Sequence, residues 1–355
     1  MQNNFEKLAD RLHQIPNGFP RTESGIELKL LAKLFTEEEA GLAAIMNTEA
    51  EPVKLIAQKA GWEERTTFVS LKNMVKKGLV EMDKTHENLV FKIIPFIVGF
   101  YERQNARIDK AFAEIFEQYY REAFHSMMQF EPSVHRIIPV EKSVPVEVGI
   151  LPYENAGHYI DNAKSWGVLN CICRVQKKLI GDVCEFSYDN CMALSSRPNA
   201  FERNDAIKAI TREEALQLLG KTEKEGLVHS VSNTKEDVSY ICNCCVCCCG
   251  LLRSMADYGY ENSVAKSDFI AVVDEENCSG CEICESRCQF KAISMVDGIC
   301  QIKLKQCFGC GICVSTCPEE AIKLIRRDEP ERIIPPENDK DWGERRMKSR
   351  KLFNE

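Results

Sequence analysis

Apolar positions near the start of the chain recur at helical spacing and then change to a strand-like pattern. The pattern predicts three helices followed by a two-stranded hairpin. Thr36 and Glu39 have the spacing of a capping box before the first helix, and Gly61 and Gly78 end the other two. The predicted helices cover residues 36–46, 51–61 and 63–78, and the strands cover 79–82 and 89–93 with residues 83–88 between them.

This order of elements resembles the winged-helix domains of small bacterial regulators, and it implies a winged helix-turn-helix over residues 1–95. Residues 24–93 hold ten Lys or Arg and eleven Asp or Glu, and the third helix opens with Glu63 and Glu64. A nucleic-acid footprint calls for a basic stripe. The charge therefore favours protein contact over DNA binding, which stays open as the alternative.

A second region, residues 96–136, is predicted to form one long helix from Tyr101 to Met128 and a proline-containing linker. Large apolar side chains recur in this helix at steps of three and four residues. Such a face packs against its own domain or pairs with the same helix of a second copy, so a homodimer is one of the expected assemblies. The residues of this face are Phe112, Ile115, Phe116, Tyr119, Tyr120, Phe124 and Met127.

Residues 137–260 alternate between strand and helix patterns, which predicts a small α/β module. Thr211 and Glu214 form a second capping box, and Gly226 ends the helix that follows it. The expected strands cover 144–150, 167–173, 227–231 and 237–241, and the other expected helices cover 154–164 and 251–258.

The composition suggests a reduced, metal-binding protein. The 355 residues carry a net charge of −8, which disfavours nucleic acid and anionic membrane as partners. The N-terminus lacks the apolar core of a signal peptide, and the longest apolar stretch, 93–101, falls short of the ~20 residues of a membrane helix. We therefore expect a cytoplasmic protein without membrane insertion. In that compartment 19 cysteines indicate metal ligands more than disulfides.

Ten cysteines belong to the middle module, six of them within eight residues. If 167–173 is a strand, Cys171 and Cys173 point to one face, as do Cys242 and Cys244. The six clustered thiols then cannot all reach one centre, and the face made by the two pairs is too wide for zinc. Iron–sulfur clusters are favoured, with zinc or a set of reactive thiols as alternatives. Cys184 and Cys191 are expected either in the cluster of the two pairs or in a second one with the cysteines at 245–249. The candidate ligands are Cys171, Cys173, Cys184, Cys191, Cys242, Cys244, Cys245, Cys247, Cys248 and Cys249.

The last module, residues 265–327, contains the same cysteine pattern twice, 29 residues apart. Each copy has the spacing C-x2-C-x2-C-x3-C, and Cys317 is followed by Pro318. The pattern resembles bacterial two-cluster ferredoxins. Gln289 departs from that family, which usually has proline there, and Cys300 lies outside the pattern as an expected buried residue.

The resemblance implies two [4Fe–4S] clusters, because in that family the fourth cysteine of each run binds the other cluster. Carried over, one cluster would be held by Cys278, Cys281, Cys284 and Cys317. The other would be held by Cys307, Cys310, Cys313 and Cys288.

Together these regions predict an α+β, multidomain protein that ends in a charged tail over residues 328–355. The tail is expected to be a solvated arm, with a docking segment as the alternative. The whole pattern, including Cys-Ile-Cys-Arg at 171–174, resembles [4Fe–4S] ferredoxin-domain proteins of anaerobes. We expect an electron carrier, or the electron-transfer subunit of an oxidoreductase, whose partner is a redox protein or larger complex. One or two further [4Fe–4S] clusters are expected in the middle module. A redox-sensing transcription regulator is the alternative, and no substrate site of its own is indicated.

Overall fold

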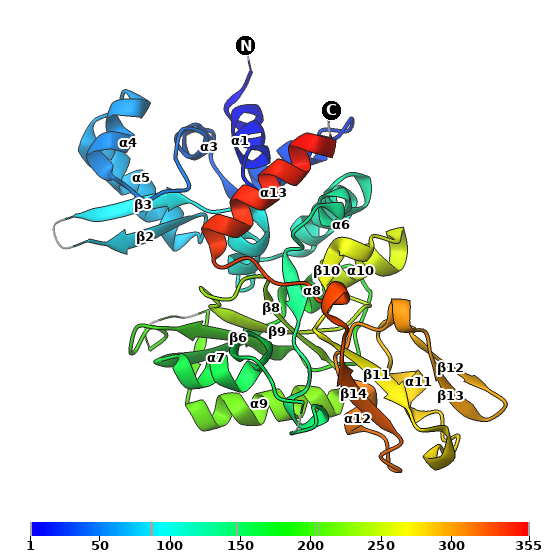
Figure 1. The fold of residues 1–355 in the computed structure, drawn as a ribbon. Coiled ribbons are helices and arrows are strands. Elements are labelled where there is room, and N and C mark those ends of the chain that lie inside the picture. Colours follow the sequence, from blue (N-terminus) through cyan, green and yellow to red (C-terminus); the bar gives the residue numbers. More distant parts are fainter. Residues whose placement is uncertain (1, 86–87, 147, 203, 205, 354–355) are drawn as a thin grey trace. The chain divides into compact units, whose positions relative to one another are not determined.

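The computed structural model describes residues 2–85, 88–146, 148–202, 204 and 206–353. Contacts divide the chain into two compact units (Figure 1). The first comprises residues 1–127 and 175–182, and the second comprises 128–174 and 183–355. The range predicted as the ferredoxin domain falls in the second unit, and so does the range predicted as the Cys-rich module except for residues 175–182, which belong to the first unit.

The first unit is mainly helical with a small sheet. Its strands pair in the order β1-β3-β2, and both pairings are antiparallel. The helices are α1 (Asn4–His13), α2 (Ile26–Leu34), α3 (Glu37–Ala44), α4 (Val53–Ala60), α5 (Glu64–Lys76) and α6 (Lys110–Glu122). The strands are β1 (Glu51–Pro52), β2 (Val80–Lys84) and β3 (Leu89–Ile93).

The three helices and the hairpin expected from the sequence are present in α3, α4, α5, β2 and β3. Thr36 caps α3, and Glu39 reaches back to the backbone of Thr36 to complete the capping box. Gly61, at φ 67°, ends α4 in the left-handed conformation that glycine adopts most readily. Residues 86 and 87, which belong to the predicted loop of the hairpin, lie outside the described residues.

The long helix predicted from Tyr101 to Met128 is wrong. α6 covers only Lys110–Glu122, because Asp109 caps its first turn and the backbone leaves the helical conformation at Ala123. Short 3-10 turns at Glu102–Gln104 and Phe124–Gln129 flank it. The apolar spacing continued through these turns, so periodicity alone did not locate the breaks.

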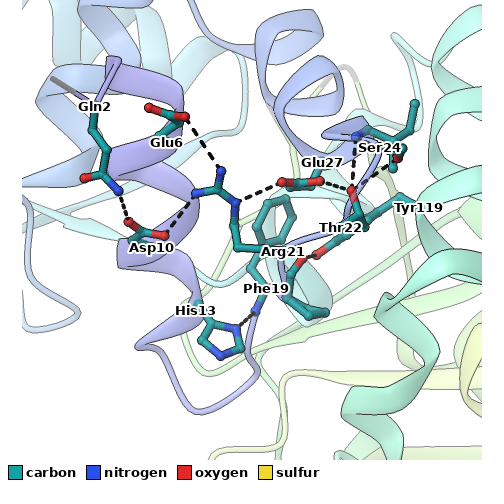
Figure 2. Close-up of polar contacts among 12 residues, drawn as sticks. Gln2, Glu6, Asp10, His13, Phe19, Arg21, Thr22, Ser24, Glu27 and Tyr119 are labelled. Carbon is teal, nitrogen blue, oxygen red and sulfur yellow. Dashed lines mark hydrogen bonds and ion pairs between the residues drawn. The ribbon is translucent and has the colours of Figure 1, made fainter.

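The aromatic face of α6 packs inside the first unit. Phe116 stacks on Tyr101 with ring centroids 4.2 Å apart, and Tyr119 contacts Phe96 and Phe19. Figure 2 shows the polar contacts beside this core: Arg21 donates to the buried carboxylate of Glu27 at 2.9 Å, and Tyr119 donates to the carbonyl of Pro20 at 3.0 Å.

The second unit is built on a seven-stranded sheet in the order β10-β4-β8-β9-β6-β5-β7. All neighbours pair antiparallel except β10 and β4. The strands are β4 (His135–Ile137), β5 (Ser165–Asn170), β6 (Asp189–Ser195), β7 (Lys208–Ile210), β8 (Val228–Ser232), β9 (Tyr240–Cys244) and β10 (Val264–Ala265).

One face of this sheet is covered by α7 (Ala156–Asn162) and α9 (Arg212–Glu225) (Figure 1). Met192 of β6 and Ile241 of β9 belong to the apolar cluster between the sheet and these helices. Because side chains alternate along a strand, Cys191 and Cys242 point to the opposite face. Thr211 caps α9 with Glu214 in the expected capping box.

Two of the predicted strands of this module are not formed as expected. The strand predicted over 167–173 ends at Asn170, and α8 (Ile172–Leu179) begins directly afterwards, so Cys171 and Cys173 do not lie on one strand. The predicted edge strand 144–150 is absent from its described residues, where a 3-10 turn at Glu141–Ser143 precedes irregular chain. Residue 147 lies outside the described part.

The ferredoxin-like region has two short helices and two small antiparallel sheets. β11 (Phe269–Val273) pairs with β14 (Ile322–Arg326), and β12 (Ile293–Val296) pairs with β13 (Ile299–Ile302). α11 (Ile283–Arg287) and α12 (Ile312–Ser315) each lie within a cysteine run and contain its third cysteine, and the two helices pack together. The sequence repeat is therefore also a structural repeat.

The tail is not a solvated arm, contrary to the prediction. The tail forms α13 (Asp339–Phe353), which is part of the second unit. The earlier helix α10 covers Gly250–Tyr258. Arg346 is fully buried and donates to the carbonyls of Phe130 and Pro132 at 2.6 and 2.7 Å. Trp342 donates to the carbonyl of Ser133 at 2.9 Å. Charged composition misled the prediction because long cationic side chains can be buried when carbonyls satisfy them.

Across the described residues, none of the helices combines the length and apolar character required to cross a bilayer.

Candidate metal centres

The first ferredoxin-type centre combines both cysteine runs. Cys278, Cys281, Cys284 and Cys317 line one small cavity, together with Cys300. Cys317 thus lies with the three thiols of the other run, as the two-cluster ferredoxin pattern requires. Cys281 is exposed, whereas Cys284 is buried.

The second ferredoxin-type centre has the complementary set. Burial raises the pKa of Cys313, and the nearby charges of Cys310, Cys307 and Cys288 raise it further. Burial likewise raises the pKa of Cys310 to about 12, with Cys288 as its first charged neighbour. The thiol of Cys288 therefore lies near thiols of the second run, as the exchange of fourth ligands would require.

Backbone N–H groups point at several of these sulfurs. The N–H of Cys300 donates to Cys278 Sγ at 3.4 Å, and that of Ala292 donates to Cys288 Sγ at 3.3 Å. Such N–H···S bonds favour the anionic form of a ligand and help set the potential of a bound cluster. Cys300 is buried as predicted, but it also touches the first centre, because its thiol bonds to Cys284.

Six cysteines of the middle module form a closed ring, which we call the six-thiol ring. For each thiol, its two neighbours in the ring are the side chains that shift its pKa most. In order around the ring these residues are Cys171, Cys173, Cys249, Cys244, Cys242 and Cys191. The ring therefore includes both pairs matched in the sequence, adds Cys191, which was one of the options for their cluster, and also adds Cys249, which was not.

Strand alternation and two helix starts produce this ring. Cys191, Cys242 and Cys244 lie on the sheet face opposite α9, where Ser230 of β8 contacts Cys244 Sγ at 3.6 Å. Cys171 immediately precedes α8, Cys173 is in the first turn of α8, and Cys249 is the N-cap residue of α10. Helix N-termini favour negative charge, so these positions suit thiolate ligands.

Hydrogen bonds within the ring concentrate charge on two of its members. Donation from Cys173 and Cys191 holds the pKa of Cys171 well below its ordinary value. Donation from Cys242 and Cys249 does the same to the pKa of Cys244. Thiolate is the form of cysteine that binds metal, so Cys171 and Cys244 are the members of the ring best suited to begin metal binding.

The remaining four cysteines form a separate and tighter group, which we call the four-thiol group. It consists of Cys184, Cys245, Cys247 and Cys248, whose sulfurs all lie within 4.8 Å of one another. Cys184 Sγ is 3.8 Å from Cys245 Sγ and 3.7 Å from Cys247 Sγ. Donation from Cys245 and Cys248 lowers the pKa of Cys247 to about 4.

Arg174 lies beside both sets of thiols. It is fully buried and donates to Asn190 Oδ1 at 2.8 Å and to the carbonyl of Asn243 at 3.0 Å. Burial alone would lower its pKa, but the charges of Cys171, Cys245 and Cys244 raise it instead. Arg174 therefore offsets thiolate charge.

Lys177 and His229 have different surroundings. Lys177 pairs with Glu117 and Asp182 in the first unit. His229 contacts Asn243 Oδ1 at 2.6 Å, and burial lowers its pKa. His229 is thus a buried histidine that is hydrogen-bonded within the module.

Gln289 connects the ferredoxin region to the cysteine run. Its Oε1 accepts from the N–H of Val246 at 3.0 Å, and its Nε2 donates to the carbonyl of Gly226 at 3.1 Å. Val246 is the residue between Cys245 and Cys247, and Gln289 directly follows Cys288. Proline could not make these side-chain bonds, which explains the departure from the ferredoxin pattern.

Fold and site together define a protein with a two-cluster ferredoxin-like region and an additional cysteine site. Residues 271–294 and 301–323 match the family model of the 4Fe-4S binding domain. The chain therefore contains two 4Fe-4S binding segments, each of which includes one of the two cysteine runs. No curated protein and no solved structure shows a significant match to the chain.

Proposed function

We propose that this protein transfers electrons through two ferredoxin-type [4Fe–4S] clusters to or from a third iron–sulfur cluster held by the six-thiol ring. The observation that carries the proposal is the presence of this ring in the same compact unit as the matched 4Fe-4S segments. Cys278, Cys281, Cys284 and Cys317 would hold one ferredoxin-type cluster, and Cys307, Cys310, Cys313 and Cys288 the other.

The six-thiol ring suits a cluster better than a single ion. Among the described residues, no three sulfurs of the ring all lie within 4.8 Å of one another. Each thiol nevertheless has two neighbours in the ring. Soft thiolates arranged around an open centre favour iron–sulfur chemistry. Six thiols exceed the four that a cubane needs, so a cluster larger than four irons also fits the ligand count.

The contacts of Gln289 support an order for the centres. We call the centre of Cys307, Cys310, Cys313 and Cys288 the Cys288 centre, and that of Cys278, Cys281, Cys284 and Cys317 the Cys281 centre. The Cys288 centre is tied through Gln289 to the loop that carries Cys245 and leads to Cys244. We infer that the Cys288 centre lies between the six-thiol ring and the Cys281 centre in the electron path.

The surface at Cys281 supports an outer position and a redox partner of positive charge. Cys281 and its neighbour Ile283 are exposed, and acidic side chains surround them in the sequence. A partner with a basic patch would be attracted by these charges, and its association would weaken with added salt. The exposed acidic residues are Asp274, Glu275, Glu276, Glu282 and Glu285.

Iron and sulfide analysis of anaerobically purified protein tests the proposal. The two ferredoxin clusters account for about eight irons per chain, so about twelve or sixteen are expected in total. EPR of the reduced protein should show three interacting centres. About eight irons in a protein with intact ferredoxin signals would refute the third cluster.

The arrangement of α3, α4, α5 and the β2-β3 hairpin supports a winged helix, which we propose serves protein contact. Lys77 is paired with Glu39 at 2.6 Å, and α5 exposes Glu64 and Val69. These features disfavour a phosphate-binding face. Binding to random and genomic DNA across a salt series checks this assignment, and cluster-dependent, sequence-selective binding would instead favour a redox-sensing regulator.

A further inference from the structure

The four-thiol group differs in size from every other thiol set in the protein. Within the described residues it is the single group of three or more Cys, His, Asp or Glu ligands whose donor atoms all lie within 4.8 Å. The two ferredoxin-type sets are more widely spaced by that measure. The protein thus contains wide and tight thiol sites side by side in one chain.

The spacing of the tight group matches one tetrahedral ion. Zinc–thiolate bonds of about 2.3 Å place the sulfurs of a regular tetrahedron about 3.8 Å apart. The measured separations are 3.8 Å for Cys184 to Cys245, 3.7 Å for Cys184 to Cys247 and 3.7 Å for Cys247 to Cys248. A four-iron cluster puts irons and sulfides between its ligands, and so requires a wider set.

The surroundings of the group are those of a closed structural site. Cys184, Cys245 and Cys248 are buried and pack with Leu227 in one apolar cluster, whereas Cys247 is exposed. Four thiolates leave no open coordination position on a tetrahedral ion. The ligand set therefore points to a structural role and not to catalysis.

We propose that Cys184, Cys245, Cys247 and Cys248 bind a single zinc ion that braces the cysteine run. The ion would join the loop carrying Cys184 to the turn 245–248, whose two ends continue into Cys244 and Cys249 of the six-thiol ring. It would also fix Val246, which bonds to Gln289. This inference does not depend on the proposed electron transfer, because it concerns a different ligand set and a redox-inert metal.

Metal analysis of the full chain and two cysteine variants tests the proposal. About one zinc per chain is expected beside the iron of the anaerobically purified protein. Cys247→Ser should lose the zinc, because a tetrathiolate site is left with three thiols. Cys242→Ser is the matched control: it removes a thiol of the six-thiol ring, so zinc should be retained while ring iron falls.

A measurement on the unaltered protein covers the case in which Cys247→Ser fails to fold. Zinc-edge X-ray absorption should show four sulfur neighbours at about 2.3 Å. Purified protein without zinc, nitrogen or oxygen in the zinc shell, or zinc retained in a folded Cys247→Ser variant would each overturn the assignment. Loss of about four irons with Cys247→Ser while the EPR signal that Cys242→Ser removes is retained would do so as well, by showing a cluster at this site. The third cluster in the ring is tested separately, because it concerns a different ligand set that Cys242→Ser probes.

Discussion

Replacing Gln289 with alanine tests the connection between the ferredoxin region and the cysteine run. The change removes two hydrogen bonds, one at 3.0 Å to the N–H of Val246 and one at 3.1 Å to the carbonyl of Gly226. Each is worth about 1 kcal/mol, so the loss is about 2 kcal/mol. That corresponds to roughly 30-fold more frequent opening at this contact.

Hydrogen exchange measured by mass spectrometry reports this opening locally. The peptide containing Val246 should exchange roughly 30-fold faster in Gln289→Ala, whereas peptides from α9 remote from Gly226 should be unchanged. Gln289→Glu retains the acceptor for Val246 but loses the donor to Gly226, so an intermediate increase is expected. Gln301, which is exposed on β13, provides the matched control as Gln301→Ala.

Unchanged exchange at Val246 in Gln289→Ala, relative to Gln301→Ala, would refute the reasoning. It would mean that the contact contributes nothing to holding the run against the ferredoxin region. The proposed order of the electron path would then lose its structural support.

Four further predictions concern individual residues. Arg174→Met should destabilise the protein by about 2–4 kcal/mol, since two buried acceptors lose their donor, and should lower the potential of the ring cluster; denaturation and redox titration measure both. Cys317→Ser should remove about four irons and the EPR signal of the Cys281 centre, whereas loss of the other ferredoxin signal alone would contradict the exchange of ligands. Thr211→Ala should cost about 1 kcal/mol in thermal unfolding without changing metal content. Gly309→Ala should reduce the iron of the Cys288 centre, because residue 309 has φ 69° and an added Cβ would overlap the carbonyl of Phe269; full iron content would refute this.

The ferredoxin region could be predicted from the sequence because its ligands are local. Each run places three thiols within seven residues, and the repeat itself indicates the pairing of the fourth. The capping boxes at Thr36 and Thr211 were likewise readable, since they depend on residues three positions apart. The cysteine runs and the helix starts at Thr36 and Thr211 depend on residues close together in the sequence, so they could be predicted without knowledge of long-range packing.

The middle module was harder because its ligands come from distant elements. Cys171 and Cys173 have the alternation of a strand, yet β5 ends before them and α8 begins. The pairing of β6 with β9 brings Cys191 beside Cys242, and no spacing in the sequence records that pairing. Arg346 was missed for a similar reason, since its carbonyl partners are over two hundred residues away.

Neighbouring residues of the cysteine run serve different sites, and this constrains how the run can change. Cys244 belongs to the six-thiol ring and Cys245 to the four-thiol group, and the assignment reverses again between Cys248 and Cys249. One residue inserted or deleted between Cys244 and Cys249 would move thiols from one site into the other. The number of residues between Cys244 and Cys249 is therefore fixed by the two sites. The high density of cysteines in this segment results from two ligand sets that alternate along it.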